Sequence, residues 1–233
     1  MATLTADASN VTAQFMALND GDTLELRDTI LDWRPVNRSF EKGVVIDATR
    51  AVVGGIYGAN CEGLEWRLGE VVLGATFRLG LRFDRSGRLA FYGFRSAGDP
   101  DMSESYGLKL NDVDGLIVSD FKAASLRAAI VLGNVTGFHI RDVEVSAMGS
   151  DGIDLFGAQK GLVEDVAGRD FAPTPGAHPD LIQMASPKGK MRTGDIVIRR
   201  VTGMGAMQGV TAFNNPNSGQ QGFGRIAIEH VDV

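Results

Sequence analysis

Short apolar segments recur along the second half of the chain at a nearly constant interval. Their centres are Leu108, Ile130, Ile153, Ile182 and Val210, separated by 22, 23, 29 and 28 residues. Each is followed by a second apolar segment, and these are centred on Val118, Ile140, Val163, Ile198 and Ile228, at offsets of 10, 10, 10, 16 and 18 residues. A period of this length is typical of repeat proteins, in which each unit packs only on its neighbours.

The apolar segments have the length and alternation of short strands. The linkers between the paired segments, such as residues 111–115 and 133–137, are short and rich in Asn, Asp and Gly. A doubly wound α/β fold needs a helix of about ten or more residues between parallel strands, and these linkers leave no room for one. We therefore predict an all-β fold, a single-stranded right-handed parallel β-helix, with rungs of roughly 22 residues stacked about 4.8 Å apart.

The rest of the chain fits one such domain over residues 1–233. Residues 1–20 are predicted to cap the solenoid, because Val11, Phe15 and Leu18 share one face of a short amphipathic helix that covers open core and strand edges. Residues 21–105 are predicted to form irregular early rungs and residues 106–233 regular ones. The last segment ends in mid-strand, so we expect a truncated C-terminus, or an end covered by a further domain or another chain.

Composition agrees with this architecture and narrows the function. The chain has 30 Gly but only 3 Tyr and 2 Trp, which suits many tight turns around a narrow aliphatic interior. A net charge of −6 and the lack of a Lys/Arg run argue against a nucleic-acid partner. We expect Cys61, the single cysteine, to be a small buried apolar residue. Neither a membrane span nor an intact secretory signal is visible.

Aligning the rungs indicates which side chains face outward together. One outward row is predicted to contain Tyr106, Ala128, Asp151, Asp180 and Gln208, and the next Lys109, Val131, Asp154, Gln183 and Thr211. Asp151, Asp154 and Asp180 would then lie within about one strand spacing of each other. The repulsion between such crowded carboxylates is relieved by a proton, a cation or a basic neighbour, and each of these is common at functional sites. The simpler alternative is that Asp151 and Asp180 form Asx turns.

Three long insertions flank the same rungs, at residues 168–179, 185–194 and 214–224. We expect them to form walls beside the aspartates, since loops on a rigid scaffold commonly bind ligands. His178 is the candidate base, whereas His139 and His230 are expected to be structural or solvated. Candidate substrate-binding residues are Lys109, Gln183, Lys188, Lys190, Arg192, Gln208 and Asn214. A solvated loop is the alternative for the three basic residues at 188–192.

Two segments carry a resemblance to known proteins. Residues 149–155 (GSDGIDL), followed by residues 162–166 (LVEDV), resemble the pectate-lyase-like β-helix superfamily, most closely its polygalacturonase-type hydrolases. That resemblance implies a catalytic role for Asp151 and Asp180. The hydrolases' Gly-His-Gly and basic motifs do not occur at the matching positions. Residues 20–26 (DGDTLEL) are similar to the start of β-helical lyases acting on alginate and chondroitin-type chains, and residues 178–183 (HPDLIQ) resemble a segment of bacterial and phage β-helix proteins.

Two classes of function follow. The first is an enzyme that cleaves an acidic polysaccharide, by lyase-type β-elimination in preference to hydrolysis, with His178 as base. The negative charge that develops on the substrate would be stabilised by basic residues of the 188–192 segment or by Ca²⁺ held by Asp151, Asp154 and Asp180. The second is a non-catalytic glycan-binding or structural module, of the kind found in phage tailspikes and bacterial surface proteins. Both predict an extracellular or virion-associated protein.

Overall fold

The computed structural model describes residues 1–73, 78–98, 105–173, 175–215, 217 and 219–233. Positions 74–77, 99–104, 174, 216 and 218, which fall in the predicted early rungs and long loops, lie outside the described residues. The elements, in order, are β1 (Thr3–Ala6), α1 (Val11–Ala17), β2 (Thr23–Leu26), β3 (Asp28–Leu31), β4 (Val36–Gly54), β5 (Ile56–Val72), β6 (Leu79–Ala97), β7 (Tyr106–Ala124), β8 (Ala128–Ser146), β9 (Asp151–Phe156), β10 (Gln159–Arg169), β11 (Asp180–Ala185), β12 (Gly194–Met204), β13 (Gln208–Phe213) and β14 (Ile226–Asp232).

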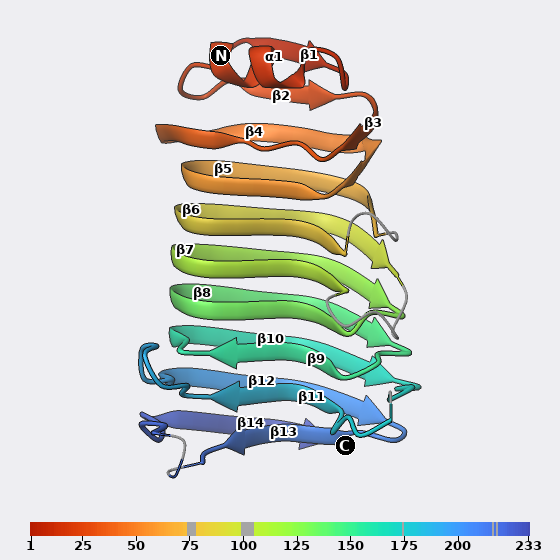
Figure 1. The fold of residues 1–233 in the computed structure, drawn as a ribbon, viewed down its shortest axis with the longest axis vertical. Coiled ribbons are helices and arrows are strands. Elements are labelled where there is room, and N and C mark those ends of the chain that lie inside the picture. Colours follow the sequence, from red (N-terminus) through yellow and green to blue (C-terminus); the bar gives the residue numbers. More distant parts are fainter. Residues whose placement is uncertain (74–77, 99–104, 174, 216, 218) are drawn as a thin grey trace.

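The strands form a parallel β-solenoid of about 7 turns, which confirms the predicted fold class. Figure 1 shows the rungs stacked along one axis, from α1 at one end to β13 and β14 at the other. Every recorded strand pairing is parallel, and the main path runs β1-β2-β4-β5-β6-β7-β8-β10-β12-β14, with β9, β11 and β13 forming the front of the last rungs. Each rung therefore pairs with the rungs directly above and below it.

The predicted register is confirmed position by position. Ile130 pairs with Leu108 and Ile153, and Ile182 pairs with Ile153 and Val210. The second series is also in register, as Val118↔Ile140, Ile140↔Val163, Val163↔Ile198 and Ile198↔Ile228. The early rungs continue the same ladder, because Leu64 pairs with Leu89 and Leu89 with Leu116. The pairing of β4 with β5 is irregular, with register shifts between Ser39 and Val44 and between Ala48 and Val52.

In β5 to β8 the two predicted strands of a rung are one long strand that bends at a corner. The bend contains a residue with a left-handed backbone, such as Asp112 (φ 54°) in β7 and Asn134 (φ 55°) in β8. Asn and Asp tolerate this conformation better than other non-glycine residues because their short side chains form local hydrogen bonds. Asn134 Nδ2 donates to Asp112 Oδ1 at 2.9 Å, so the corners also bond to each other between rungs. This is why the linkers are rich in Asn and Asp.

The interior differs along its length. The rungs near the N-terminus are filled by rings, with Trp66 packed against Trp33, Phe83 and Phe91 at centroid distances of 5.7, 5.8 and 6.5 Å. The later rungs have aliphatic cores such as Ile130, Ile153 and Ile182. The expectation of an aliphatic interior therefore holds for the later rungs only. Cys61 is buried, as expected.

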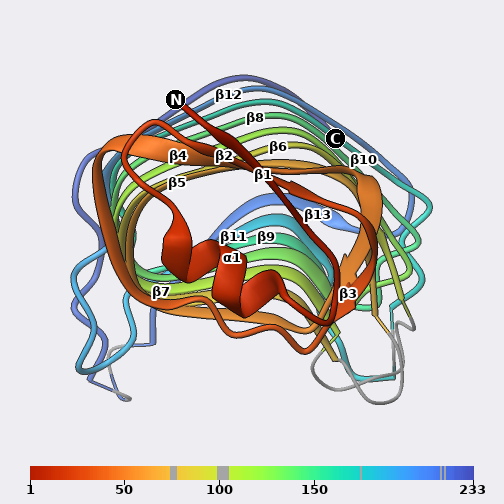
Figure 2. The ribbon, with the colours of Figure 1, turned by 90° about the horizontal axis from the view of Figure 1, so that it is seen from above.

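Helix α1 covers the N-terminal end of this core, as predicted (Figure 2). Val11, Phe15 and Leu18 are buried, and the Phe15 ring meets the edge of Trp33 at 5.4 Å. Among the described residues, no helix is long and apolar enough to cross a membrane.

The long insertions emerge at the two edges of the front strands. In the view along the axis, the connections β11–β12 and β13–β14 project on one side, and the connection β10–β11 on the other (Figure 2). The face presented by β9, β11 and β13 lies between them.

Candidate functional site

The aspartates predicted to converge come from adjacent rungs of the front face. Asp151 pairs with Ala128 in β8, and Asp154 pairs with Val131 in β8 and Gln183 in β11. Gly152 and Ile153 both point into the core, because a Cβ on Gly152 would lie 3.3 Å from Val145 and Ile153 is fully buried. This local bend places Asp151 and Asp154, three positions apart, on the same outward side. Asp180 and Gln183 in β11 have the same spacing.

Hydrogen bonds hold Asp151 and Asp180 in place. Asp151 Oδ1 accepts from the backbone N–H of Asp180 at 3.0 Å, and its Oδ2 accepts from Ser150 Oγ at 2.8 Å. Asp180 Oδ2 accepts from Gln183 Nε2 at 2.7 Å. One carboxyl oxygen each of Asp154 and Asp180 is buried and has no hydrogen-bond partner among the described residues. Buried polar atoms rarely lack a partner, so these two oxygens mark a site built for more than stability.

Burial changes the acidity of this cluster. The side chains are almost inaccessible, with residue exposures of 8% for Asp151, 6% for Asp154 and 3% for Asp180. Burial raises the pKa of Asp154 well above its usual value, and the negative charges of Asp151 and Asp180 raise it further. Burial also raises the pKa of Asp151. A carboxyl group with a raised pKa can hold a proton and act as an acid near neutral pH, which an ordinary surface aspartate cannot.

Ca²⁺ binding by Asp151, Asp154 and Asp180 stays a prediction. Among the described residues, no group of three or more His, Cys, Asp or Glu side chains is arranged to hold a metal ion. The simpler alternative was an Asx turn at Asp151 and Asp180. The backbone N–H that Asp151 accepts belongs to Asp180 in the next rung, and not to its own turn. The positive charges of Arg127 and Lys109 partly offset the repulsion between the carboxylates.

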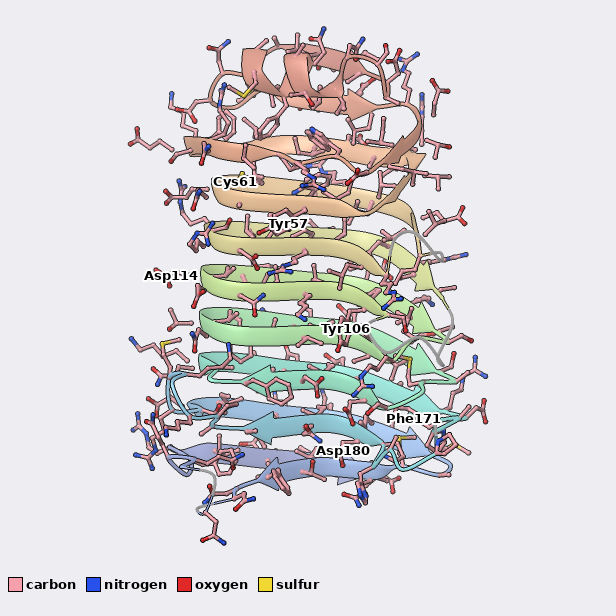
Figure 3. All side chains as sticks on the ribbon, viewed as in Figure 1. Tyr57, Cys61, Tyr106, Asp114, Phe171 and Asp180 are labelled. Atoms are coloured by element: carbon pink, nitrogen blue, oxygen red, sulfur yellow. The ribbon has the colours of Figure 1, made fainter. Side chains whose placement is uncertain are left out.

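Cationic side chains of the neighbouring rungs face the same cluster. The Lys109 ammonium lies 4.7 Å from the ring centroid of Tyr106, so both side chains project from β7 on the outward side. The positive charges of Arg127 and Lys109 favour ionisation of Asp154 and so oppose the effect of burial. Lys109 therefore lies where the alignment of the rungs predicted it. Figure 3 shows Tyr106 at the level of β7 and Asp180 at the level of β11, with β8 and β9 between them.

A second polar cluster on this face was not foreseen. Asp84 in β6 accepts hydrogen bonds from Arg82 Nη2 at 2.7 Å, from Tyr57 Oη at 2.9 Å and from Asn111 Nδ2 at 2.9 Å. The Arg82 guanidinium lies over the Tyr57 ring at 5.0 Å. Burial alone would raise the pKa of Asp84, but these three donors outweigh it and lower the pKa. Tyr57 and Arg82 lie in the row of Lys109 and Asp154, whereas Asp84 and Asn111 lie two positions further along their strands, in the row of Gly133 and Phe156.

The three basic residues of the 185–194 insertion separate in space. Lys190 is half-buried and reaches the front face, where its Nζ lies 3.0 Å from the point that a Cβ on Gly133 would occupy. The bond from Met191 N to Asn134 Oδ1, at 3.0 Å, fixes this segment against β8. Lys188 is exposed next to Gly219, and Arg192 donates to the carbonyl of Phe223. The structure therefore brings Lys190 to the face and directs the other two toward the 214–224 insertion.

The remaining predicted residues lie at the edge of the site. His178 is exposed, two residues before Asp180, and forms no hydrogen bond or ion pair with another described residue. Gln183 is held by Asp180, whereas Gln208 in the last rung is exposed and pairs in register with Asp180. Asn214 is exposed at the start of the last insertion.

Two other features lie away from this face. A groove of about 1040 Å³ runs along the ends of the second strands and is lined by Glu70, Arg95, Lys122, Glu144 and Thr202 among others. On the second-strand face, Glu164 accepts from Arg199 and Arg200 and lies 2.8 Å from His139 Nε2. The hydrogen bond with His139, followed by those from Arg199 and Arg200, lowers the pKa of Glu164 to about 2. His139 is thus part of a structural ion-pair network, which agrees with its predicted role.

Comparison with protein-family models and with curated proteins gives no match. Among solved structures, an alginate lyase from Paenibacillus sp. str. FPU-7 has a TM-score of 0.67 and 12% identity, covering 100% of this chain and 99% of that one. An endo-xylogalacturonan hydrolase from Aspergillus tubingensis follows, with a TM-score of 0.47 and 11% identity over 99% and 92% of the chains. A mannuronic acid specific polysaccharide family 6 lyase from human gut microbiota has a TM-score of 0.32 and 11% identity over 98% and 83%.

The first of these similarities shows that the chain shares the parallel β-helix fold of that alginate lyase, the fold that the resemblance implied. At 12% identity the likeness concerns the fold, and it assigns no residue a role.

Proposed function

We propose that the protein binds an acidic polysaccharide across its front strands and cleaves it by β-elimination beside Asp151, Asp154 and Asp180. The observation that carries the proposal is the convergence of buried carboxyl groups, two of them with a raised pKa, with Lys109, Arg127 and Lys190 on one face. The similarity in fold to an alginate lyase, an enzyme of a polyuronate, supports the same substrate class.

The chemistry requires three functions. A base removes the proton on the carbon next to the uronate carboxylate, a positive or protonated group stabilises the resulting charge, and the bond to the leaving oxygen breaks as a carbon–carbon double bond forms. A protonated Asp154 can donate a hydrogen bond to the substrate carboxylate, whereas an ionised one would repel it. Lys109 adds the positive charge. Asp151, whose pKa is raised, can return a proton to the leaving oxygen.

His178 remains our proposed base. It is exposed at the edge of the aspartate cluster, where the connection β10–β11 enters β11, and an imidazole nitrogen can accept a proton. The flanking backbone is anchored, since the carbonyl of Pro179 accepts the N–H of Gln208 at 2.8 Å.

Hydrolysis is the second candidate, and the acid pair itself favours it. Asp151 and Asp154 have a raised pKa, and the neighbouring carboxyl of Asp180 accepts a hydrogen bond. In glycosidases, one carboxyl group of such a set acts as the acid and another as the base or nucleophile. The products separate the two reactions. β-elimination leaves an unsaturated uronate that absorbs in the ultraviolet, whereas hydrolysis releases only reducing ends.

The test is incubation with alginate, pectate and chondroitin-type polymers, followed by both product assays, for the wild type and for Asp151→Asn, Lys109→Met and His178→Ala. We expect ultraviolet-absorbing product from one acidic polymer, and a loss of about 100-fold or more with each variant. Reducing ends without absorbance would assign hydrolysis. Binding without any product would assign the glycan-binding alternative. A protein acting on such polymers is expected outside the cell or on a virion.

A further inference from the structure

The cluster of Tyr57, Arg82, Asp84 and Asn111 has no role in the proposed reaction. Three donors from three different rungs converge on Asp84, whose side chain is only 8% exposed, while the Arg82 side chain is 36% exposed. The buried acid thus holds a partly exposed guanidinium in one orientation on the same face as the aspartates.

We propose that this cluster is a distal subsite that binds a uronate unit of the same polysaccharide. The inference rests on the proposed function and extends it, because it defines how much of the polymer the protein recognises. The Arg82 guanidinium, stacked over Tyr57, offers a charged donor for a sugar carboxylate beside an aromatic ring face for the apolar side of a sugar ring. The same combination recurs at Lys109 over Tyr106, nearer to the aspartates.

The ion pair between Arg82 and Asp84 differs from the other contacts of Asp84, because Tyr57 and Asn111 reach Asp84 from neighbouring rungs. Arg82 and Asp84 are two positions apart on β6, so their ion pair does not join one rung to the next. Exposed pairs that do join rungs, such as Lys122 with Glu144 and Arg88 with Glu62, lie elsewhere on the solenoid. The pair with Asp84 instead fixes the direction of Arg82, and the hydrogen bonds from Tyr57 and Asn111 keep Asp84 ionised.

The subsite lies at a defined distance from the reacting bond. Arg82 in β6 and Asp154 in β9 lie in one row, three rung steps apart through Lys109 in β7 and Val131 in β8. At about 4.8 Å per step the separation is about 14 Å, or about three sugar rings if one ring spans roughly one step. A chain of two or three units that occupies the aspartates cannot reach Arg82, whereas a longer polymer contacts both.

The experiment compares substrates of different length. For Arg82→Met we expect the KM for a long polyuronate to rise about tenfold or more, with kcat unchanged, and the KM for a trisaccharide to stay as in the wild type. Arg67→Met is the matched control, since Arg67 pairs with Glu65 in the same spacing on the second-strand face. Arg82→Lys should recover part of the affinity, and Tyr57→Leu should raise the polymer KM while leaving the ion pair intact.

Thermal melting of each variant separates loss of binding from loss of folding. The proposal is overturned if Arg82→Met and Tyr57→Leu, both folded, bind the polymer as the wild type does, or if the KM rises equally for polymer and trisaccharide. If the wild type cleaves no polyuronate, the proposed reaction fails on its own. The subsite is then judged by the calorimetric Kd for the intact polymer, and an unchanged Kd in both variants overturns it.

Discussion

Replacing Asp154 by Asn should separate the stability of the protein from its activity. Burial raises the pKa of Asp154 well above its usual value, and one of its oxygens has no partner among the described residues. Asn has nearly the same shape, carries no charge, and offers N–H donors to Asp151 and Asp180. We expect Asp154→Asn to fold, to be at least as stable as the wild type at neutral pH, and to lose nearly all activity.

The magnitude follows from proton linkage. The pKa of Asp154 is raised in the folded protein, whereas in the unfolded chain it is about 3.9. Between these two values the folded state binds the extra proton, so the free energy of unfolding decreases as the pH rises. The wild type should therefore lose up to about 1.4 kcal/mol per pH unit relative to Asp154→Asn above pH about 3.9, until the pH passes the folded-state pKa.

The assay is urea unfolding followed by circular dichroism, for both proteins, at pH values between about 4 and 8. Asp195→Asn serves as the control. Its carboxylate bonds Arg225 at 2.7 Å, which lowers its pKa, so this group stabilises the fold above its unfolded pKa and cannot give a gain that grows with pH. A constant difference between wild type and Asp154→Asn at all pH values would refute the reasoning, as would a variant that retains full activity.

Three further predictions concern the scaffold. Glu164→Gln should lower the free energy of unfolding by about 1–3 kcal/mol at neutral pH and leave activity unchanged. Because the pKa of Glu164 is lowered to about 2, this loss of stability should shrink as the pH falls from the ordinary pKa of a glutamate toward 2, which urea unfolding at acid pH measures. Gly161→Ala should cost about 1–3 kcal/mol in urea unfolding, since the new Cβ would lie 2.0 Å from the Phe138 ring. Phe15→Ala, which removes the edge contact with Trp33, should cost about 3–5 kcal/mol and increase hydrogen exchange in β1 and β2.

The periodic part of the fold was predictable because each rung repeats the same physical problem. Ile153 and Ile182 occupy equivalent positions in a narrow core, so their spacing in the sequence gives their pairing even though an insertion separates them. The meeting of Asp151 and Asp180 follows from that register.

The cluster around Asp84 was not predictable by the same means. Only the second strands of the early rungs stood out as apolar, through pairs such as Leu64 and Trp66. The first strands of these rungs alternate core residues with polar ones such as Tyr57 and Arg82, so the apolar repeat is not apparent there in the sequence. Aligning Leu81 with Leu108 would have placed Arg82 beside Lys109 and Asp84 beside Asn111.

Loop conformation was the other gap. The sequence groups Lys188, Lys190 and Arg192, but the backbone of the insertion sends Lys190 to one side and its neighbours to the other. Gly133 makes room for Lys190 on the front face, because a side chain there would collide with the Lys190 ammonium and with Asn111 Oδ1. Such a long-range steric relation leaves no local signal in the sequence.

The most direct test of the account is a crystal structure of Asp151→Asn soaked with an acidic oligosaccharide of about six units. We predict sugar density along the front strands from β6 to β9, with one carboxylate at Lys109 and another at Arg82. Sugar bound only in the groove lined by Arg95 and Lys122, with the front face empty, would contradict it.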